Sequence, residues 1–367
     1  MGKSQNAATN RVSGGYNTVY PIVKTLLESD VVPILWGPPG VGKSTMAQEL
    51  AKKFNIPCVI QILSHQADPA DLVGGKLPGK ITVDGKEKPV LHDACPGWFI
   101  EYYEKNQPFL LFLDEVPNSP AHATTILNSI ILERRIGQFK LPEGTKVLCA
   151  GNRMEDQCMV YPLSAALQQR MAHIELMADV QDFTLYAKKK GLEPQIAAYI
   201  NWKGLSGLIV NEGSYPRICP RVWEMADNVL KIAGSTDRKN LVNILGSVVG
   251  LKAAIDFKTF LEVWGNIDLK KALAGEIPDF ANMEESTKYA FTFAYATEIN
   301  RIYKNKTQKA KFDWNIASKV ILAKGYPTSL ATVFFINLDE SPIKEAANCS
   351  AFQSLIDRVV PLLTMKF

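Results

Sequence analysis

Apolar and polar positions alternate in blocks along the first 178 residues of the chain. Five short apolar runs predict buried strands: VVPILW at 31–36, CVIQIL at 58–63, FLLFLDE at 109–115, TKVLCAGN at 145–152 and MAHIEL at 171–176. Four stretches with apolar residues at helical spacing separate them, at 16–29, 43–54, 124–134 and 163–170. Nearly continuous apolar strands alternating with helices predict an α/β fold with a parallel sheet covered on both faces.

Two stretches interrupt this alternation. Residues 76–91, KLPGKITVDGKEKPVL, predict two short strands around the turn signal Asp84-Gly85. Residues 135–147, RIGQFKLPEGTKV, predict a second hairpin-like excursion before the fourth strand. A minimal nucleotide-binding sheet needs neither of them, so we interpret both as insertions.

Strand signals fade after about residue 178, and helical spacing takes over. The clearest helical stretches are 220–233, 240–264 and 285–303. These patterns predict four regions. They are a flexible N-terminal segment at 1–15, an α/β core at 16–178, a helical lid at 179–265 and a helical C-terminal extension at 266–367.

Composition narrows the class of protein only a little. Of the 367 residues, 47% are hydrophobic and 21% are charged, and the formal net charge of +4 is too small to indicate nucleic acid by itself. No apolar run approaches about 18 residues, so no membrane span is expected. The N-terminus is polar and the six cysteines form no CxxC pair. We therefore expect a cytoplasmic protein with reduced thiols rather than disulfides or zinc.

The strongest chemical signal is WGPPGVGKST at 36–45, between an apolar run and a helix. It fits G-x-x-x-x-G-K-[ST], a loop whose backbone N–H groups surround a phosphate. Lys43 would reach the β- and γ-phosphates, and the Ser44 hydroxyl would bind Mg²⁺. A glycine-rich turn without a ligand is the alternative, which the strand–turn–helix context disfavours. The expected nucleotide-binding residues are Gly37, Pro38, Pro39, Gly40, Val41, Gly42, Lys43, Ser44, Thr45 and Asp114.

Two acidic residues end the apolar run FLLFLDE. Asp114 is expected to hold Mg²⁺ through water, and Glu115 to polarise the water that attacks the γ-phosphate. The alternative is a pair of solvated acids in a loop. The position at the end of a strand that should lie beside the phosphate loop favours the catalytic interpretation.

Three further polar residues are candidates by position. Asn152 follows a strand and would contact the γ-phosphate or orient water, although Asn is also a common turn former. Arg170 ends a helix and Arg221 begins one, and each would neutralise transition-state charge. Arg217 competes with Arg221 for that role. For any of these arginines, a surface ion pair is the competing interpretation.

The order of these elements resembles that of the AAA+ ATPases. In that family's terms they are similar to Walker A, Walker B (Asp114 and Glu115), sensor 1 (Asn152), an arginine finger (Arg170) and sensor 2 (Arg221). SHQADPADLVGG and ILNSIILERRIGQFKLPEGTKVLCAGN resemble segments of the MoxR branch. The resemblance covers about residues 15–265.

The resemblance implies a ring, often a hexamer, that binds ATP and Mg²⁺ between subunits and remodels a protein partner. In the MoxR branch that partner frequently carries a von Willebrand factor A domain. The residues themselves leave other functions open. The second carboxylate, Glu115, argues against a kinase, which must exclude water, and no NKxD element supports a GTPase. A nucleic-acid motor would use the lysines at 76–88 and 304–311, and a nucleotide-dependent assembly protein would not turn over ATP.

Overall fold

The computed structural model describes residues 11–65, 69–118, 123–153, 163–210, 217–236, 240–353 and 355–356. The chain divides into two compact units, residues 1–177 and 178–367, and each is considered by itself. Among the described residues, no helix is both long and apolar enough to cross a membrane.

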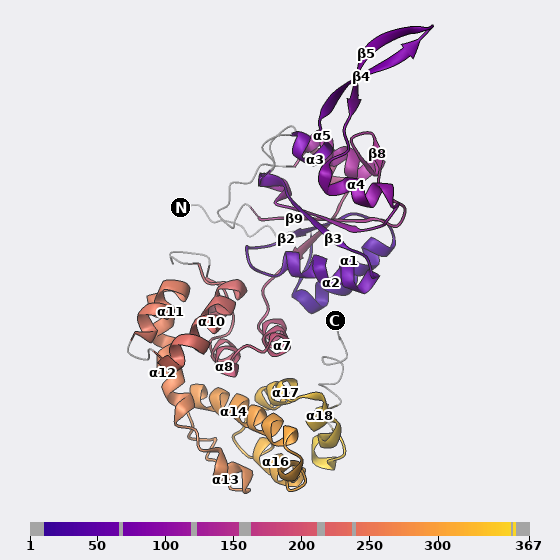
Figure 1. Ribbon diagram of the computed structural model, residues 1–367. Coiled ribbons are helices and arrows are strands. Elements are labelled where there is room, and N and C mark those ends of the chain that lie inside the picture. The colour runs from indigo at the N-terminus through magenta and orange to yellow at the C-terminus, as the bar shows by residue number, and fades with distance from the viewer. Residues whose placement is uncertain are drawn as a thin grey trace, which may run out of the picture. The chain divides into compact units, whose positions relative to one another are not determined.

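Unit 1 contains a six-stranded sheet in which every pairing is parallel (Figure 1). In spatial order its strands are β1 (Val12–Gly14), β10 (Ala172–Leu176), β2 (Pro33–Trp36), β9 (Lys146–Gly151), β6 (Leu110–Asp114) and β3 (Cys58–Ile62). The predicted α/β fold class is therefore confirmed. The expectation of a flexible segment up to residue 15 is wrong for β1, which pairs with the edge of the sheet.

The other elements of unit 1 are helices and two hairpins. The helices are α1 (Tyr16–Glu28), α2 (Lys43–Phe54), α3 (Pro69–Val73), α4 (Gly97–Glu104), α5 (Ala123–Asn128) and α6 (Ala165–Gln168). The hairpins are β4 (Lys76–Val83) with β5 (Lys86–Asp93), and β7 (Arg135–Ile136) with β8 (Phe139–Lys140). Short helical turns lie at Leu63–His65, Val116–Asn118 and, with π-helical pairing, Ser129–Glu133.

The strand order brings three strand ends together. Strand β9 lies between β2 and β6, and all three strands are parallel. Their carboxyl ends therefore lie next to one another at the same end of the sheet. The strands are apolar because helices cover them, and β2, β9 and β6 are buried except at their ends. This end is where ligands bind in open parallel sheets.

The regular elements described in unit 2 are all helices, joined by turns and loops, apart from an isolated bridge between Val210 and Ile218. Its helices are α7 (Val180–Lys190), α8 (Pro194–Lys203), α9 (Leu205–Leu208), α10 (Pro220–Thr236), α11 (Leu241–Val249), α12 (Leu251–Gly265), α13 (Leu269–Leu273), α14 (Glu285–Lys304), α15 (Lys306–Lys309), α16 (Trp314–Ile321), α17 (Thr328–Asn337) and α18 (Glu340–Ala346), followed by a 3₁₀ turn at Ser350–Phe352.

Two hydrophobic cores lie in unit 2. The first, which we call the lid core, gathers residues such as Tyr199, Trp223 and Phe257. The second, the extension core, gathers residues such as Tyr295 and Phe334. Both take side chains from α14, in which residues 290–296 are buried without a break.

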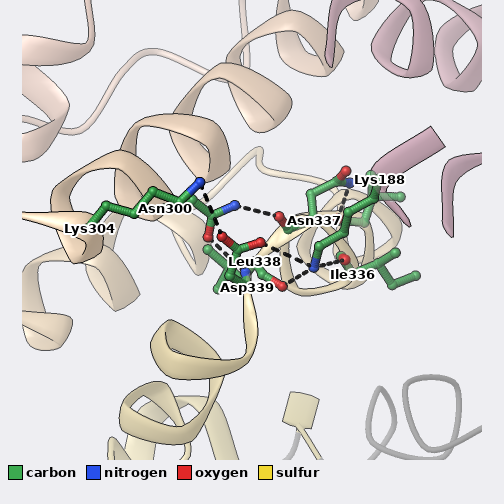
Figure 2. A network of polar contacts seen from close by, with 8 residues as sticks. Lys188, Asn300, Lys304, Ile336, Asn337, Leu338 and Asp339 are labelled. Atoms are coloured by element: carbon green, nitrogen blue, oxygen red, sulfur yellow. Dashed lines mark hydrogen bonds and ion pairs between the residues drawn. The ribbon is translucent and has the colours of Figure 1, made fainter. Parts of the chain in front are cut away.

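A polar network in unit 2 closes the end of α17 (Figure 2). The Lys188 ammonium, from α7, donates to the carbonyl of Ile336 at 3.1 Å and to that of Leu338. Asn300, from α14, donates to the carbonyl of Asn337 at 2.8 Å and accepts the Asp339 N–H at 2.7 Å. The last carbonyls of a helix have no partner inside it, so these two side chains satisfy them.

Candidate nucleotide site

The phosphate loop joins the end of β2 to the start of α2 and depends on three glycines. Gly40 and Gly42 have φ angles of 76° and 104°, which side chains rarely adopt. A Cβ on Gly37 would lie 2.4 Å from the carbonyl oxygen of Leu176. Gly42 caps α2 without a side chain, so no side-chain oxygen accepts from the first turn of that helix. A helix N-terminus in this state is suited to an anion.

Lys43 lies inside the loop rather than in solvent. The residue is 8% exposed, and its ammonium donates to the carbonyl of Gly37 at 2.6 Å and to that of Pro38 at 3.1 Å. It also donates to Asn152 Oδ1 at 2.9 Å. Asn152 immediately follows β9, the neighbour of β2, so the strand order accounts for this contact. Two residues that the sequence nominated separately thus meet in the structure.

Ser44 and Asp114 form the second contact of the site. The Ser44 hydroxyl donates to Asp114 Oδ2 at 3.3 Å. As expected, the end of this strand lies close to the phosphate loop, although β9 separates β6 from β2 within the sheet. Asp114 still reaches the first turn of α2. A hydroxyl and a carboxylate are oxygen ligands that suit Mg²⁺, which usually takes one or two carboxylates and substrate phosphates.

Glu115 is held by contacts on both of its sides. Its φ of 56° is left-handed, and its backbone N–H donates to Asp114 Oδ1 at 2.9 Å. Its carboxylate accepts a hydrogen bond from the Ser64 hydroxyl. The sequence did not point to Ser64, whose only signal is its place just after β3, the strand that pairs with β6. The described residues contain no cluster of three or more His, Cys, Asp or Glu suited to a metal.

The arginine candidates stand apart from this group of residues. Arg170 was expected at the end of a helix, but α6 ends at Gln168, and Arg170 lies in the turn that follows. Its exposed guanidinium donates to Asn128 Oδ1 at 2.8 Å. Arg221 is exposed at the second position of α10, and Arg217 is half-buried just before Ile218. Both belong to unit 2, so their role at the nucleotide stays a prediction.

A link that the sequence did not reveal runs between β2 and the turn of Arg170. The ring planes of Trp36 and His173 are nearly parallel, 10° apart, and Trp36 Nε1–H donates to His173 Nδ1 at 3.0 Å. His173 Nδ1 is therefore an acceptor, and its Nε2–H donates to the carbonyl of Gln168 at 2.8 Å. The guanidinium of Arg11 lies 4.7 Å above the Trp36 ring.

Comparison with known proteins agrees with this geometry in part of the chain. Residues 33–171 match a family described as "AAA domain (dynein-related subfamily)". Two curated adenylate kinases are similar over shorter stretches. They are 28% identical over 117 residues (Caldanaerobacter subterraneus subsp. tengcongensis) and 29% identical over 124 residues (Bifidobacterium longum). These alignments cover 28% of this chain and 52% and 64% of the relatives, so the chain spans about half to two thirds of their length.

Two solved structures resemble the chain more loosely. The RuvB Holliday junction branch migration motor of Thermotoga maritima has a TM-score of 0.39 at 14% identity, covering 87% of each chain. NtrX of Brucella abortus in complex with ADP has a TM-score of 0.40 at 14% identity, covering 90% of this chain and 67% of that one. The firmer evidence is the family match, the parallel sheet and the loop that holds Lys43. Residues 33–171 of this chain therefore match an AAA domain family and combine a parallel sheet with a glycine-rich loop that holds Lys43.

Proposed function

We propose that the chain hydrolyses ATP in an oligomeric ring and uses the cycle to remodel or activate a protein partner, as MoxR-like AAA+ proteins do. The observation that carries the hydrolysis proposal is the meeting of four residues at one edge of the sheet. Lys43 contacts Asn152, and Ser44 contacts Asp114, next to Glu115. Each residue type suits one part of phosphate chemistry.

The proposed chemistry divides the work among these side chains. Lys43 exchanges its carbonyl partners for phosphate oxygens, and Asn152 turns to the γ-phosphate or to the attacking water. Ser44 and Asp114 would hold Mg²⁺, which would supply positive charge against the phosphate oxygens. Glu115 accepts the proton of the attacking water, as a general base. Ser64 orients the Glu115 carboxylate through its hydrogen bond.

Glu115 also helps to decide between hydrolysis and the phosphoryl transfer that the similarity to adenylate kinases suggests. A kinase transfers the phosphoryl group to an acceptor and must keep water out. A second carboxylate placed next to the one that holds the metal favours attack by water instead. We therefore prefer hydrolysis to phosphoryl transfer for this site, although both reactions begin from the same phosphate loop.

The proposals of a ring and of a protein partner rest on Arg170 and on the order of the motifs. Arg170 is exposed in this unit and contacts none of the four site residues among those described, which fits an arginine offered to a neighbouring subunit. The order of motifs resembles that of MoxR proteins, so a partner with a von Willebrand factor A domain is the first to test. A nucleic-acid motor is the alternative. It is disfavoured because two of the four lysines on the β4–β5 hairpin are already paired with carboxylates.

The experiment that tests hydrolysis is Glu115→Gln. The variant keeps the shape of the side chain and the Asp114 carboxylate, so ATP should still bind. Steady-state turnover should fall by about 10²–10⁴-fold, the usual contribution of a general base. Glu143→Gln, at an exposed position, is the matched control and should hydrolyse ATP like the unsubstituted chain. Normal turnover in Glu115→Gln would assign the base to another residue.

A further inference from the structure

The β4–β5 hairpin is an isolated two-stranded ribbon. Its strands pair antiparallel from Lys76 opposite Asp93 to Val83 opposite Lys86. Asp84 and Gly85 form its tip with φ angles of 52° and 73°, as a two-residue type I′ turn requires. Figure 1 shows the ribbon extending away from the sheet and helices of unit 1. Both of its faces are therefore open to solvent.

The two faces of the hairpin differ in composition. Residues directly opposite in an antiparallel pair point to the same face, and the face alternates along each strand. One face, the basic-apolar face, carries Leu77, Gly79, Ile81, Val83, Lys86, Lys88, Val90 and His92. The other, the paired face, carries Lys76, Pro78, Lys80, Thr82, Glu87, Pro89, Leu91 and Asp93.

The charges are balanced on one face only. On the paired face Lys76 forms an ion pair with Asp93, and Lys80 forms one with Glu87 at 2.8 Å. The basic-apolar face has no carboxylate. Among the described residues, neither Lys86 nor Lys88 takes part in an ion pair. This face therefore presents two positive charges without compensation.

The basic-apolar face also exposes large apolar side chains beside those charges. Leu77 is 57% exposed and Ile81 is 42% exposed, near the half-buried Val83 and Val90. Such a combination fits a partner that offers apolar and negative groups together. A nucleic-acid strand would need aromatic rings for its bases, and the hairpin has no Phe, Tyr or Trp.

We propose that the basic-apolar face of the hairpin binds an extended protein segment that carries both apolar and acidic side chains on one of its faces, at every second residue. The apolar side chains of the segment would cover Leu77 and Ile81, and its carboxylates would pair with Lys86 and Lys88. The inference rests on the proposed function, because it names the chemistry of the partner on which the ATP cycle acts.

The test compares three double variants of the full-length chain in the presence of ATP. The probe is a fluorescein-labelled peptide in which Leu and Glu take turns at every second position, with Ser between them, so that both point to the same face of an extended chain. Its binding is followed by anisotropy. Lys86→Gln with Lys88→Gln should weaken binding about tenfold, the size expected when two exposed ion pairs are lost. Lys76→Gln with Lys80→Gln removes the same charge from the paired face and should change affinity less than about twofold. Leu77→Ser with Ile81→Ser should weaken binding by a similar factor without changing the charge.

The outcomes separate this proposal from the proposed function. Equal losses in the two lysine variants would overturn it, since net charge alone would then govern binding. The same peptide with Lys in place of each Glu would overturn it as well if it bound as tightly, and so would single-stranded DNA that displaces the acidic peptide and depends on Lys86 and Lys88. ATP turnover by the unsubstituted chain, measured in parallel, tests the motor itself. Turnover without peptide binding would reject only the hairpin proposal.

Discussion

A nucleotide that binds in the loop must replace the present hydrogen-bond partners of Lys43. Its buried ammonium is already satisfied by the carbonyls of Gly37 and Pro38 and by Asn152. A phosphate that enters the loop competes with these neutral acceptors and wins because its oxygens are charged. Asn152 is released by the same exchange, so the γ-phosphate contact proposed for it becomes available when Lys43 changes partner.

Lys43→Ala should therefore abolish ATP binding. Loss of one phosphate-contacting cation from a desolvated site should cost about 2–5 kcal/mol of binding free energy. Titration with a fluorescent ATP analogue measures it directly. Lys52→Ala, exposed on the same helix, is the control and should bind normally. ATP affinity within a factor of about two of the unsubstituted chain would remove Lys43 from the site.

The sequence nominated residues that meet at the candidate site, but it did not predict all of their contacts. The motif assigned Lys43 and Ser44 to phosphate and Mg²⁺, because the backbone of such a loop leaves few alternatives. Contacts between strand ends depend on the order of strands in the sheet, which a local pattern does not encode. For that reason Ser64 beside Glu115, and His173 beside Trp36, were found only in the structure.

At the scale of elements, the sequence predicted most helices and both hairpins, but it did not predict the breaks within helical stretches. The predicted helix at 43–54 matches α2, but the stretch 124–134 becomes α5 followed by a π-helical turn. The residue periods of an α-helix and of a π-helical turn are hard to tell apart over so few residues. Gly250, with a φ of 84°, divides the stretch 240–264 into α11 and α12. The three-residue strand β1 is too short to give a pattern.

The contacts of Lys188 at the end of α17 predict a loss of stability when this lysine is replaced. Burial lowers the pKa of the Lys188 ammonium, and the nearby Asp339 opposes that change. In Lys188→Met the carbonyls of Ile336 and Leu338 lose their donor while remaining inside the protein. The free energy of unfolding should fall by about 1–3 kcal/mol, the cost of leaving buried polar groups unsatisfied.

Urea unfolding of the full chain, followed by circular dichroism, measures this loss. Lys190→Met is the matched control, because Lys190 lies on the same helix and is exposed. It should change the free energy of unfolding by less than about 0.5 kcal/mol. Equal effects of the two substitutions would show that Lys188 does not act through the end of α17.

At the scale of the whole molecule, the proposed ring makes each ATP site composite. Arg170→Ala should lose about 10³–10⁵-fold in turnover if this arginine stabilises the transferred phosphoryl group. Lys43→Ala should be inactive for want of bound nucleotide. When the two variants are mixed and exchange subunits, some interfaces pair an intact phosphate loop with an intact Arg170. ATPase activity measured against mixing ratio should therefore rise above that of either variant.

Two measurements make the mixing experiment decisive. Subunit exchange is confirmed with distinct fluorescent labels on the two variants. The sensitivity of the ring to inactive neighbours is obtained by diluting the unsubstituted chain with Lys43→Ala alone. Activity that stays at the level of the single variants, although co-assembly is proven and dilution is tolerated, would place Arg170 outside a shared site.

The two cores of unit 2 have a consequence for how the predicted lid and extension fold. Within α14, Phe293 belongs to the lid core and Phe291 to the extension core. A chain that stopped at residue 265, the predicted end of the lid, would deprive Phe257 and Phe260 of Ala290 and Phe293. Neither core is complete without the same helix, so the two cores should gain and lose their structure together, as one cooperative folding unit.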